Sequence, residues 1–546
     1  MRPARLELSA GSHGDAVRRR LDAWRRESVP NRLAARDADL WASAASEEAE
    51  DRLGWIDLPR TGEETLGDWL GFAAAERAAG IDRVVVLGMG GSSLAPEVFE
   101  RVFGGERPVV VVLDSTHPDA VRRLDENLDL ERTLFVVSSK SGSTVETLSL
   151  FRYFWERASR SGDRGRHFVA ITDPGSPLEE LAKRLRFHRI FAAPPDVGGR
   201  YSALSAFGLV PAAFTGVDLR SLVGRGRSAL ADLEGGWSRA ASIVELGAFL
   251  GELARVGIDK LTLVTAPGLE SFPDWLEQLV AESTGKQGRG ILPVVGEALA
   301  EPSTYGPDRL FVGILLDGER GGSLERSLKR LAAAGFPVAL TRLSDRLDLG
   351  YEMVRWEIAV ALAGSVLAID PFSQPDVERA KRLARDLMAG ETEVLRAVES
   401  IERRSVGEVT TKDLDDWLEA DEVEYVAICA YLPSDEETAD RLARLRHVLG
   451  RRSGRPVTVG IGPRFLHSTG QLHKGGAKGA RFLQLIQPAQ RDLPIPQSEG
   501  SFGELVAAQA DGDAAALVEC GQTVLRIELG EAVDLDRLIR RVEGSA

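Results

Sequence analysis

Cysteine, long apolar runs and surplus basic charge are all scarce in this sequence, and each shortage excludes a class of protein. Only Cys429 and Cys520 occur among the 546 residues, too few for a disulfide framework or a cysteine-rich metal site. The longest apolar stretch, Ile358 to Ile369, is too short to span a bilayer. The opening MRPARLELSAGSHGD lacks the apolar core of a signal peptide. We therefore expect a cytoplasmic protein without a membrane span.

The charge balance is acidic. Lys and Arg total 68 against 83 Asp and Glu, which gives a formal net charge of −15. Such a chain is a poor general binder of nucleic acid or of an anionic membrane, but a small anion needs only a local site. The apolar share of 43% and the charged share of 28% are typical of globular proteins, and the length predicts about three to five domains.

Three stretches repeat one pattern, in which an apolar run is followed by a Gly/Ser turn and an amphipathic helix. This alternation predicts an α/β fold with parallel sheets. We expect a helical segment without strands over residues 1–63, and α/β units over 64–220, 237–390 and 391–546. The expected strands include RVVVLGMGG, TLFVVSSKSGS, LTLVTAP, FPVALTRL, EYVAICAYL and PVTVGIG.

The segment SSKSGSTVET, residues 138–147, is the strongest local signal. An apolar strand ends at Val137, and a helix is expected to begin near Thr144. The N-terminus of a helix offers unpaired N–H groups and positive potential, which suit a phosphate. A plain N-cap with a polar turn uses the same residue types, so the segment alone leaves both interpretations open. No GK[ST] follows, which excludes a Walker A loop. Hydroxyl groups from Ser139, Ser141, Ser143 and Thr144 would add further hydrogen-bond donors for a phosphate.

A glycine-rich turn, LGMGGSSLAP over residues 87–96, follows another expected strand. Its glycines permit close backbone approach to a ligand, although it lacks the GxGxxG spacing of a dinucleotide site. Two such turns after strands of one sheet would both lie at its carboxyl edge. Open α/β sheets bind their ligands at that edge.

Two further segments carry single candidates for catalysis. Arg200 in VGGRYSALSAFGL follows two glycines and could reach over a pocket, but spacing alone favours a surface arginine at a helix start. Glu282 in VAESTGKQGRGI ends a helical stretch beside a glycine-rich loop, where it could be a positioned base. A solvated glutamate is the plainer interpretation.

Two later segments add Gln374, Lys381, His467 and His473. PFSQPDVERAK holds Gln374 and Lys381, and an exposed helix face is the alternative for the lysine. PRFLHSTGQLHKGG holds the two histidines six residues apart. A zinc site would need further ligands that the sequence does not obviously supply.

Taken together, these strings resemble the phosphoglucose isomerase family, which is built from two sugar-isomerase (SIS) domains. The resemblance covers roughly residues 64–390. It implies two doubly wound parallel sheets, with a third α/β domain beyond them, and interconversion of glucose 6-phosphate and fructose 6-phosphate without metal or cofactor. The strings that carry it, in order, are GMGGSSLAP, SKSGSTVET, GGRYSALSAFGL, ESTGK and PFSQPDVERAK.

The resemblance also implies a role for each matching position. Ser139, Lys140, Ser141 and Thr144 would hold the sugar phosphate, while Gly91 and Ser92 would line the sugar site and Gln374 would contact the substrate. Arg200 would face the reacting carbons, Glu282 would be the base that transfers the proton through a cis-enediol, and Lys381 would assist ring opening.

The histidine departs from the family pattern. The family places its catalytic histidine between the glutamate and the lysine, but no histidine lies between Glu282 and Lys381 here. LHSTGQ around His467 resembles the L-H-S-x-G-Q string of short bacterial isomerases, and QLHKGG around His473 resembles the Q-L-I-H-Q-G string of longer ones. His467 is favoured and His473 is the runner-up. The arrangement resembles the isomerase half of bifunctional transaldolase/phosphoglucose isomerase proteins.

We expect the third unit to deliver this histidine, either within one chain or across a homodimer. A non-catalytic sugar-phosphate regulator is the rival class, but it would not need Glu282, Arg200 and Lys381 together. An isomerase of a related sugar phosphate is the remaining alternative.

Overall fold

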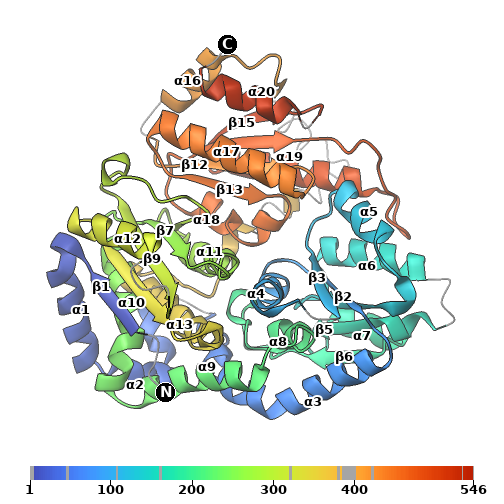
Figure 1. The fold of residues 1–546 in the computed structure, drawn as a ribbon, viewed down its shortest axis with the longest axis horizontal. Helices are drawn as coiled ribbons and strands as arrows, with labels where there is room; N and C mark the ends of the chain where they lie inside the picture. Colours follow the sequence, from blue (N-terminus) through green and yellow to red (C-terminus); the bar gives the residue numbers. More distant parts are fainter. Residues whose placement is uncertain are drawn as a thin grey trace.

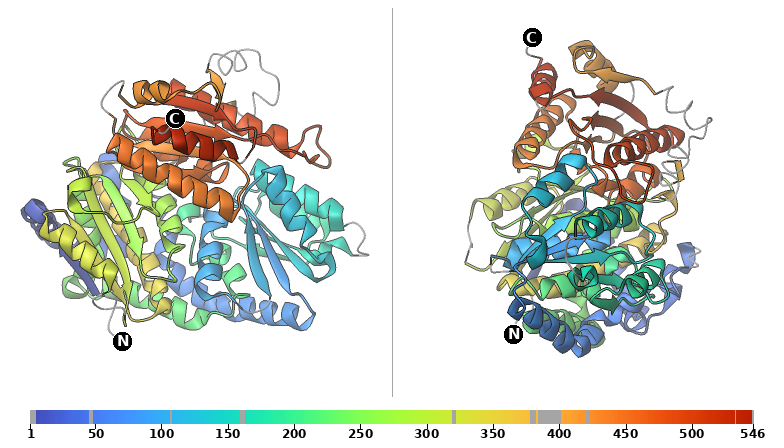
Figure 2. Two further views of the ribbon diagram at one scale, coloured as in Figure 1. Left: turned by 45° about the horizontal axis from the view of Figure 1, so that its top comes forward. Right: turned by 90° about the vertical axis from the view of Figure 1, so that its right-hand side faces the viewer.

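The computed structural model describes residues 5–44, 48–105, 108–158, 163–318, 322–377, 382–383, 401–419, 423–531 and 533–544. Three five-stranded sheets occupy the corners of a roughly triangular molecule, and the third rests across the other two (Figures 1 and 2). Every pair of neighbouring strands is parallel except the one that includes the first strand. The predicted α/β fold class is therefore confirmed.

The first sheet has the order β3-β2-β4-β5-β6 and is entirely parallel. The apolar runs of its central strands are buried on both faces, as expected where helices cover a parallel sheet. The strands are β2 (Arg83–Leu87), β3 (Val109–Leu113), β4 (Thr133–Ser138), β5 (Phe168–Thr172) and β6 (Arg189–Ala192). The helices are α4 (Leu94–Phe103), α5 (Pro118–Glu126), α6 (Val145–Arg157), α7 (Pro177–Leu185) and α8 (Ala206–Ala212).

The second sheet has the order β1-β10-β9-β7-β8. Its edge strand β1 (Arg5–Ser9) pairs antiparallel with β10, so the expectation of an N-terminal segment without strands was wrong. The strand is short, and Leu6 and Leu8 pack against the main core. The other strands are β7 (Lys260–Thr265), β8 (Leu292–Val295), β9 (Arg309–Leu316) and β10 (Val338–Leu343).

The remaining helices of residues 14–367 pack around these two sheets (Figure 1). One hydrophobic cluster runs from Val17 through both sheets to Phe372. The helices are α1 (Gly14–Arg26), α2 (Val29–Ala34), α3 (Leu58–Ala78), α9 (Leu219–Glu234), α10 (Trp237–Ala254), α11 (Phe272–Thr284), α12 (Ser323–Ala333) and α13 (Leu349–Leu367). Within the described residues, no helix is both long and apolar enough to cross a membrane.

The third sheet has the order β11-β15-β14-β12-β13 and is also parallel. It has its own core, and a further cluster joins it to α11 and β8 through Ala281, Leu292 and Val294. The strands are β11 (Arg403–Ser405), β12 (Val426–Tyr431), β13 (Val457–Ile461), β14 (Arg481–Ile486) and β15 (Thr523–Glu528). The helices are α16 (Thr411–Glu419), α17 (Glu436–Ser453), α18 (Gly470–Gly475), α19 (Phe502–Glu519) and α20 (Val533–Val542), and the short 3-10 helix η11 (Arg464–His467) precedes α18.

Candidate active site

The glycine-rich turn after β2 contacts two segments from other parts of the chain. Gly90 has φ 55°, and a Cβ there would lie 2.7 Å from the carbonyl oxygen of His467. A Cβ on Gly91 would lie 2.1 Å from the carbonyl oxygen of Gly199. Both distances are shorter than real contacts, so only glycine lets these backbones approach. The turn thus brings the segments that carry Arg200 and His467 together at the edge of the first sheet, with Ser92 buried beside them.

Arg200 is buried, and the surface arginine favoured by spacing alone is wrong. Only 3% of the residue is exposed. Its Nη1 lies 2.9 Å from Oε1 of Glu282, and its Nε donates to Oγ of Ser283 at 2.9 Å. Its Nη2 donates to the carbonyl oxygens of Pro371 at 2.6 Å and Ser373 at 3.0 Å. The guanidinium therefore ties the GGR segment to α11 and to the PFSQ segment.

Glu282 lies in the last turn of α11 and is 6% exposed, so it is not a solvated surface glutamate. The side-chain amide of Gln278, one turn earlier, donates to Oε2 of Glu282 at 3.0 Å and to the carbonyl oxygen of His467 at 2.8 Å. Nζ of Lys286 donates to the carbonyl oxygens of Glu282 and Ser283. Burial, together with the nearby charge of Arg200, lowers the pKa of Lys286 well below its usual value.

His467 reaches the first sheet from the third. Its Nε2 lies 2.8 Å from Oε1 of Glu146, which stands in the first turn of α6. Because a carboxylate accepts hydrogen bonds, this contact favours the tautomer that carries the ring hydrogen on Nε2. The side-chain amide of Gln509, on α19, donates to the same oxygen at 2.6 Å.

His473, the runner-up, lies in a different environment. It is 2% exposed, and neither ring nitrogen has a hydrogen-bond partner among the described residues. The rings of Tyr425, Phe465 and Phe482 surround it at centroid distances of 5.1 to 6.4 Å. Burial in this apolar surrounding lowers the pKa of His473 to about 3.

The hydroxyl loop lies between β4 and α6. Oγ of Ser139 lies 3.0 Å from Oγ1 of Thr144, and Oγ of Ser141 lies 2.9 Å from Oγ of Ser143. Thr144 occupies the N-cap position, yet its side chain makes no capping hydrogen bond. The plain N-cap interpretation, which needs a capping hydroxyl, therefore loses its main support.

Lys140 extends away from these hydroxyls. Its Nζ donates to Oδ2 of Asp173 at 2.6 Å and to the carbonyl oxygen of Pro195 at 3.0 Å. Partial burial lowers the pKa of Lys140, while the bond to Asp173 opposes that shift.

The PFSQ segment brings Gln374 to the site but leaves its side chain exposed. Lys381 lies outside the described residues, so its position carries no argument. Gln471, from the LHSTGQ string, donates to the carbonyl oxygen of Gly285 at 2.9 Å and to Oδ2 of Asp376 at 2.6 Å. It therefore joins the LHSTGQ string to ESTGK and to PFSQPDVERAK.

The sequence analysis did not identify four polar residues that form hydrogen bonds with the predicted site residues or their segments. Glu146, Gln278 and Gln471 lie in or next to the quoted strings, so their polar character at those positions was a usable signal. Gln509 lies in no recognised string and was not detectable. Its contact with Glu146 joins residues 363 positions apart.

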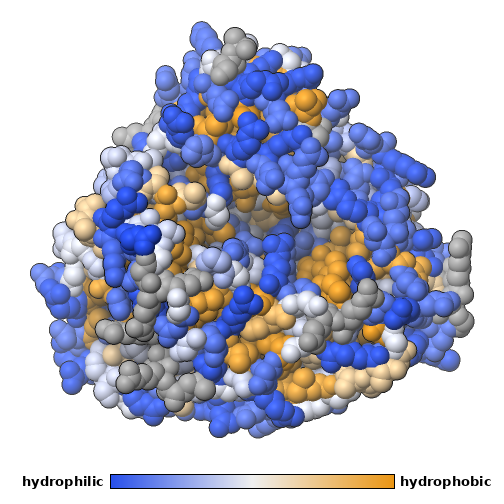
Figure 3. All heavy atoms as spheres, in the orientation of Figure 1, coloured by the Kyte–Doolittle hydropathy of each residue, from blue (hydrophilic) through white to orange (hydrophobic). Residues whose placement is uncertain are grey.

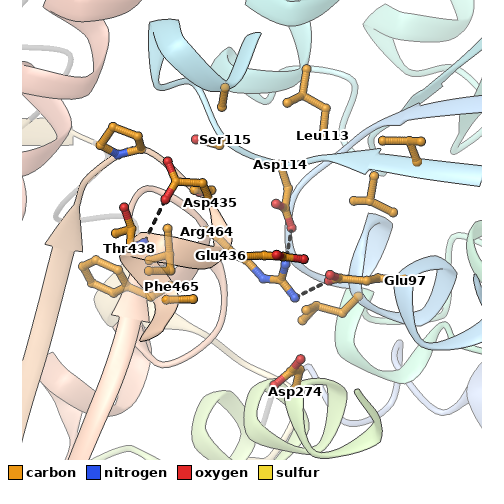
Figure 4. A pocket seen from close by; sticks show the side chains of 18 of the residues that line it. Glu97, Leu113, Asp114, Ser115, Asp274, Asp435, Glu436, Thr438, Arg464 and Phe465 are labelled. Atoms are coloured by element: carbon orange, nitrogen blue, oxygen red, sulfur yellow. Dashed lines mark hydrogen bonds and ion pairs between the residues drawn. The ribbon is translucent and has the colours of Figure 1, made fainter. Parts of the chain in front are cut away.

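A cleft of about 1590 Å³ lies where the three sheets meet (Figure 4). Arg464 of η11 points into it and pairs with Glu97 and with Asp114, whose Oδ2 lies 3.3 Å from Nη1. Its lining includes Asp274 and Glu277 of α11, but none of Arg200, Glu282 and His467. The cleft and the group formed by Arg200, Glu282 and His467 are therefore separate features. In Figure 3, hydrophilic residues predominate on the third unit, at the top of the view, with small apolar patches between them.

Comparison with known proteins identifies the family. The model of the family described as phosphoglucose isomerase matches residues 61–290, which include the glycine turn, the hydroxyl loop, Arg200 and Glu282. A probable glucose-6-phosphate isomerase of Haloarcula marismortui is 32% identical over 388 residues, which span 64% of this chain and 87% of that relative. The chain belongs to the phosphoglucose isomerase family.

A second relative agrees with membership of the phosphoglucose isomerase family, and a solved structure shares the fold. A glucose-6-phosphate isomerase of Thermus thermophilus is 32% identical over 386 residues, 62% of this chain and 91% of the relative. The crystal structure of a hypothetical protein, also from Thermus thermophilus, has a TM-score of 0.60 at 27% identity, and the match covers 70% of this chain and 100% of that one. Each match covers part of this chain.

Proposed function

We propose that this protein interconverts glucose 6-phosphate and fructose 6-phosphate. The observation that carries the proposal is the buried contact between Arg200 and Glu282, which Gln278 joins to the backbone of His467 beside the glycine turn. A cation, a carboxylate and the backbone of a histidine thus meet at the edge of the sheet that also carries the hydroxyl loop, and the imidazole of that histidine contacts Glu146 directly after the loop. The relatives named glucose-6-phosphate isomerase support the same reaction.

The proton transfer is assigned to Glu282. Its carboxylate takes a proton from one of the two reacting carbons, C1 or C2, and returns it to the other through a cis-enediol. Arg200 stabilises the negative charge that develops on oxygen, because buried charges act strongly where water is excluded. Ser139, Ser141 and Thr144 hold the phosphate, and Gly91, Ser92 and Gln374 border the sugar. Phosphate binding energy then orients the reacting carbons.

Ring opening is assigned to His467. A neutral imidazole that donates through Nε2 to Glu146 keeps Nδ1 to exchange a proton with the sugar. Lys381 remains the proposed partner in this step. His473 is set aside, because its ring is enclosed by aromatic side chains.

We further propose that each chain builds its own complete site, because Glu146, Glu282 and His467 meet within one chain. A homodimer would then not be needed to supply the histidine. The expected cytoplasmic location and the exclusion of nucleic acid and membrane partners belong to the same proposal. Isomerisation of a related sugar phosphate would use the same groups, and substrate comparison decides between them.

The variant Glu282→Gln tests the function, because glutamine keeps the size of the side chain but cannot accept the proton. We expect fructose 6-phosphate conversion, followed by a coupled assay, to fall at least about 1000-fold, while glucose 6-phosphate still protects the variant against heat. Glu277→Gln is the matched control, since Glu277 lies on the same helix but faces the cleft. Near-normal turnover in Glu282→Gln would remove this residue from the mechanism. Protection without turnover in the parent protein would favour the regulator.

A further inference from the structure

Glu146 is held from two directions. Its Oε1 receives Nε2 of His467 at 2.8 Å and the side-chain amide of Gln509 at 2.6 Å. Glu146 and Gln509 are both buried, with 4% and 5% exposure. Glu146 follows the hydroxyl loop of the first sheet, whereas His467 and Gln509 come from different elements of the third. Two elements of the third unit therefore converge on one carboxylate oxygen.

The orientation of the Gln509 amide is itself fixed. Oγ1 of Thr116, which follows β3 and is fully buried, lies 3.2 Å from Oε1 of Gln509. A hydroxyl can donate to that oxygen, and the amide NH₂ then faces the carboxylate. The reversed amide would place its oxygen against the carboxylate, which repels it. Thr116, Gln509 and Glu146 thus form an ordered chain that ends at His467.

We propose that Gln509 is a positioning residue for ring opening, which acts by holding Glu146 in the orientation that fixes the imidazole of His467. This inference rests on the proposed function. A hydrogen bond to an ionised acceptor is stronger than one between neutral groups, so the amide restrains the carboxylate. The amide is neutral, so it adds no charge of its own beside the carboxylate. Without Gln509, the carboxylate could turn about its χ angles, and the geometry that general acid–base catalysis requires would be lost part of the time.

The test measures ring opening apart from isomerisation. Opening and reclosing the ring of glucose 6-phosphate exchanges its α and β anomers, and magnetisation-transfer NMR measures that exchange. In the Glu282→Gln background the carbon-to-carbon proton transfer is removed, so anomer exchange reports the histidine step alone. The variants are Gln509→Leu, which removes the donor, and Thr116→Val, which keeps the shape but releases the amide.

We expect Gln509→Leu to slow anomer exchange about tenfold, a part of the 10²–10⁴ that general acid–base catalysis supplies. KM for isomerisation in the otherwise unaltered protein should stay within about twofold, because Gln509 touches neither phosphate nor sugar in the proposed site. Thr116→Val should slow exchange about twofold to threefold. The ¹⁵N signals of His467 in the parent should report the hydrogen on Nε2, and that preference should weaken in Gln509→Leu.

Gln522→Leu is the matched control. Gln522 is another buried amide of the third unit, and it donates to the carbonyl oxygens of His473 and Ala477 instead of a carboxylate. Equal losses of exchange in Gln509→Leu and Gln522→Leu would overturn the proposal, as would unchanged exchange in Gln509→Leu. If Gln509→Leu fails to fold, Thr116→Val decides: exchange at the parent rate overturns the proposal. A parent protein that neither isomerises nor exchanges anomers refutes the proposed function instead.

Discussion

Two neighbouring segments of the third unit each carry a histidine, and they differ in almost everything else. His467 of η11 contacts a carboxylate of the first unit, and its backbone accepts from α11 of the second. His473 of α18 is enclosed by three aromatic rings and has no hydrogen-bond partner for either nitrogen in the described part of the chain. Both lie in strings that resemble family motifs. The comparison shows that the side chains in contact with a histidine, and not its neighbours in the sequence, decide which chemistry it can perform.

The physical contrast is between an imidazole with a charged partner and one without. A carboxylate partner fixes the tautomer and stabilises the imidazolium that forms when the ring takes up a proton. An apolar enclosure penalises the charged ring, which holds the pKa of His473 at about 3. His473 therefore stays neutral near pH 7 and acts as a packing group.

The largest expected effect is on turnover. His467→Ala should slow conversion of the cyclic sugar about 100-fold or more, because a positioned general acid–base group contributes about 10²–10⁴. His473→Leu should stay within about threefold of the parent. A coupled assay of fructose 6-phosphate conversion measures both. The larger loss in His473→Leu would reverse the assignment and break the comparison.

A second, smaller effect concerns Arg464, whose ion pairs hold η11 against the first unit. Arg464→Met removes the cation that pairs with Glu97 and Asp114 and leaves both carboxylates without it. We expect turnover to fall about tenfold because His467 is no longer held in place, with a lower melting temperature because a partly buried ion pair loses its cation. Burial already raises the pKa of Asp114, so this carboxyl will take up a proton more readily in the variant.

Arg101→Met is the matched control for the anchor. Arg101 also pairs with Glu97, at 2.8 Å, but its side chain is 62% exposed, and exposed pairs contribute about 0–1 kcal/mol. Turnover and melting temperature should therefore stay close to those of the parent. Equal turnover losses in Arg101→Met and Arg464→Met would show that η11 does not depend on this anchor.

Much of the fold could be predicted, because local pattern and final environment agree. The valine-rich runs of β2 and β4 are buried on both faces, as their composition indicates. The short edge strands β1 and β11 could not be predicted, because a segment of three to five residues becomes a strand only when a partner offers its edge.

The candidate site was predicted unevenly for a similar reason. The sequence strings that resemble the family identified Arg200 and Glu282 as candidates. Without that resemblance, the interpretation was a surface arginine and a solvated glutamate. Their burial follows from a contact between segments 82 positions apart in the chain (282 − 200). Gln509 shows the limit most clearly, because a glutamine in a helix says nothing about a carboxylate 363 positions away.

The smallest expected effect concerns His473 and is measured as the pH dependence of the free energy of unfolding. The pKa of His473 is about 3 in the folded protein and about 6.5 in an unfolded chain. Below pH 6.5 the unfolded state therefore binds more protons than the folded state, and the contribution of the neutral buried ring is lost as the pH falls from 6.5 toward 3. Above pH 6.5 that contribution is fully present.

His473→Leu removes this pH dependence, since leucine cannot titrate. Relative to the parent, the variant should gain about 2 kcal/mol of unfolding free energy between pH 7 and pH 5, because each pH unit below 6.5 costs the parent about 1.4 kcal/mol. Melting curves at the two pH values measure the change as a difference between variant and parent. His447→Leu, at an exposed position on α17, removes no buried ring and should show little relative change. A His473→Leu variant that tracks the parent at both pH values would mean that the ring accepts a proton in the folded protein. His473 would then again be a candidate for the histidine that opens the sugar ring.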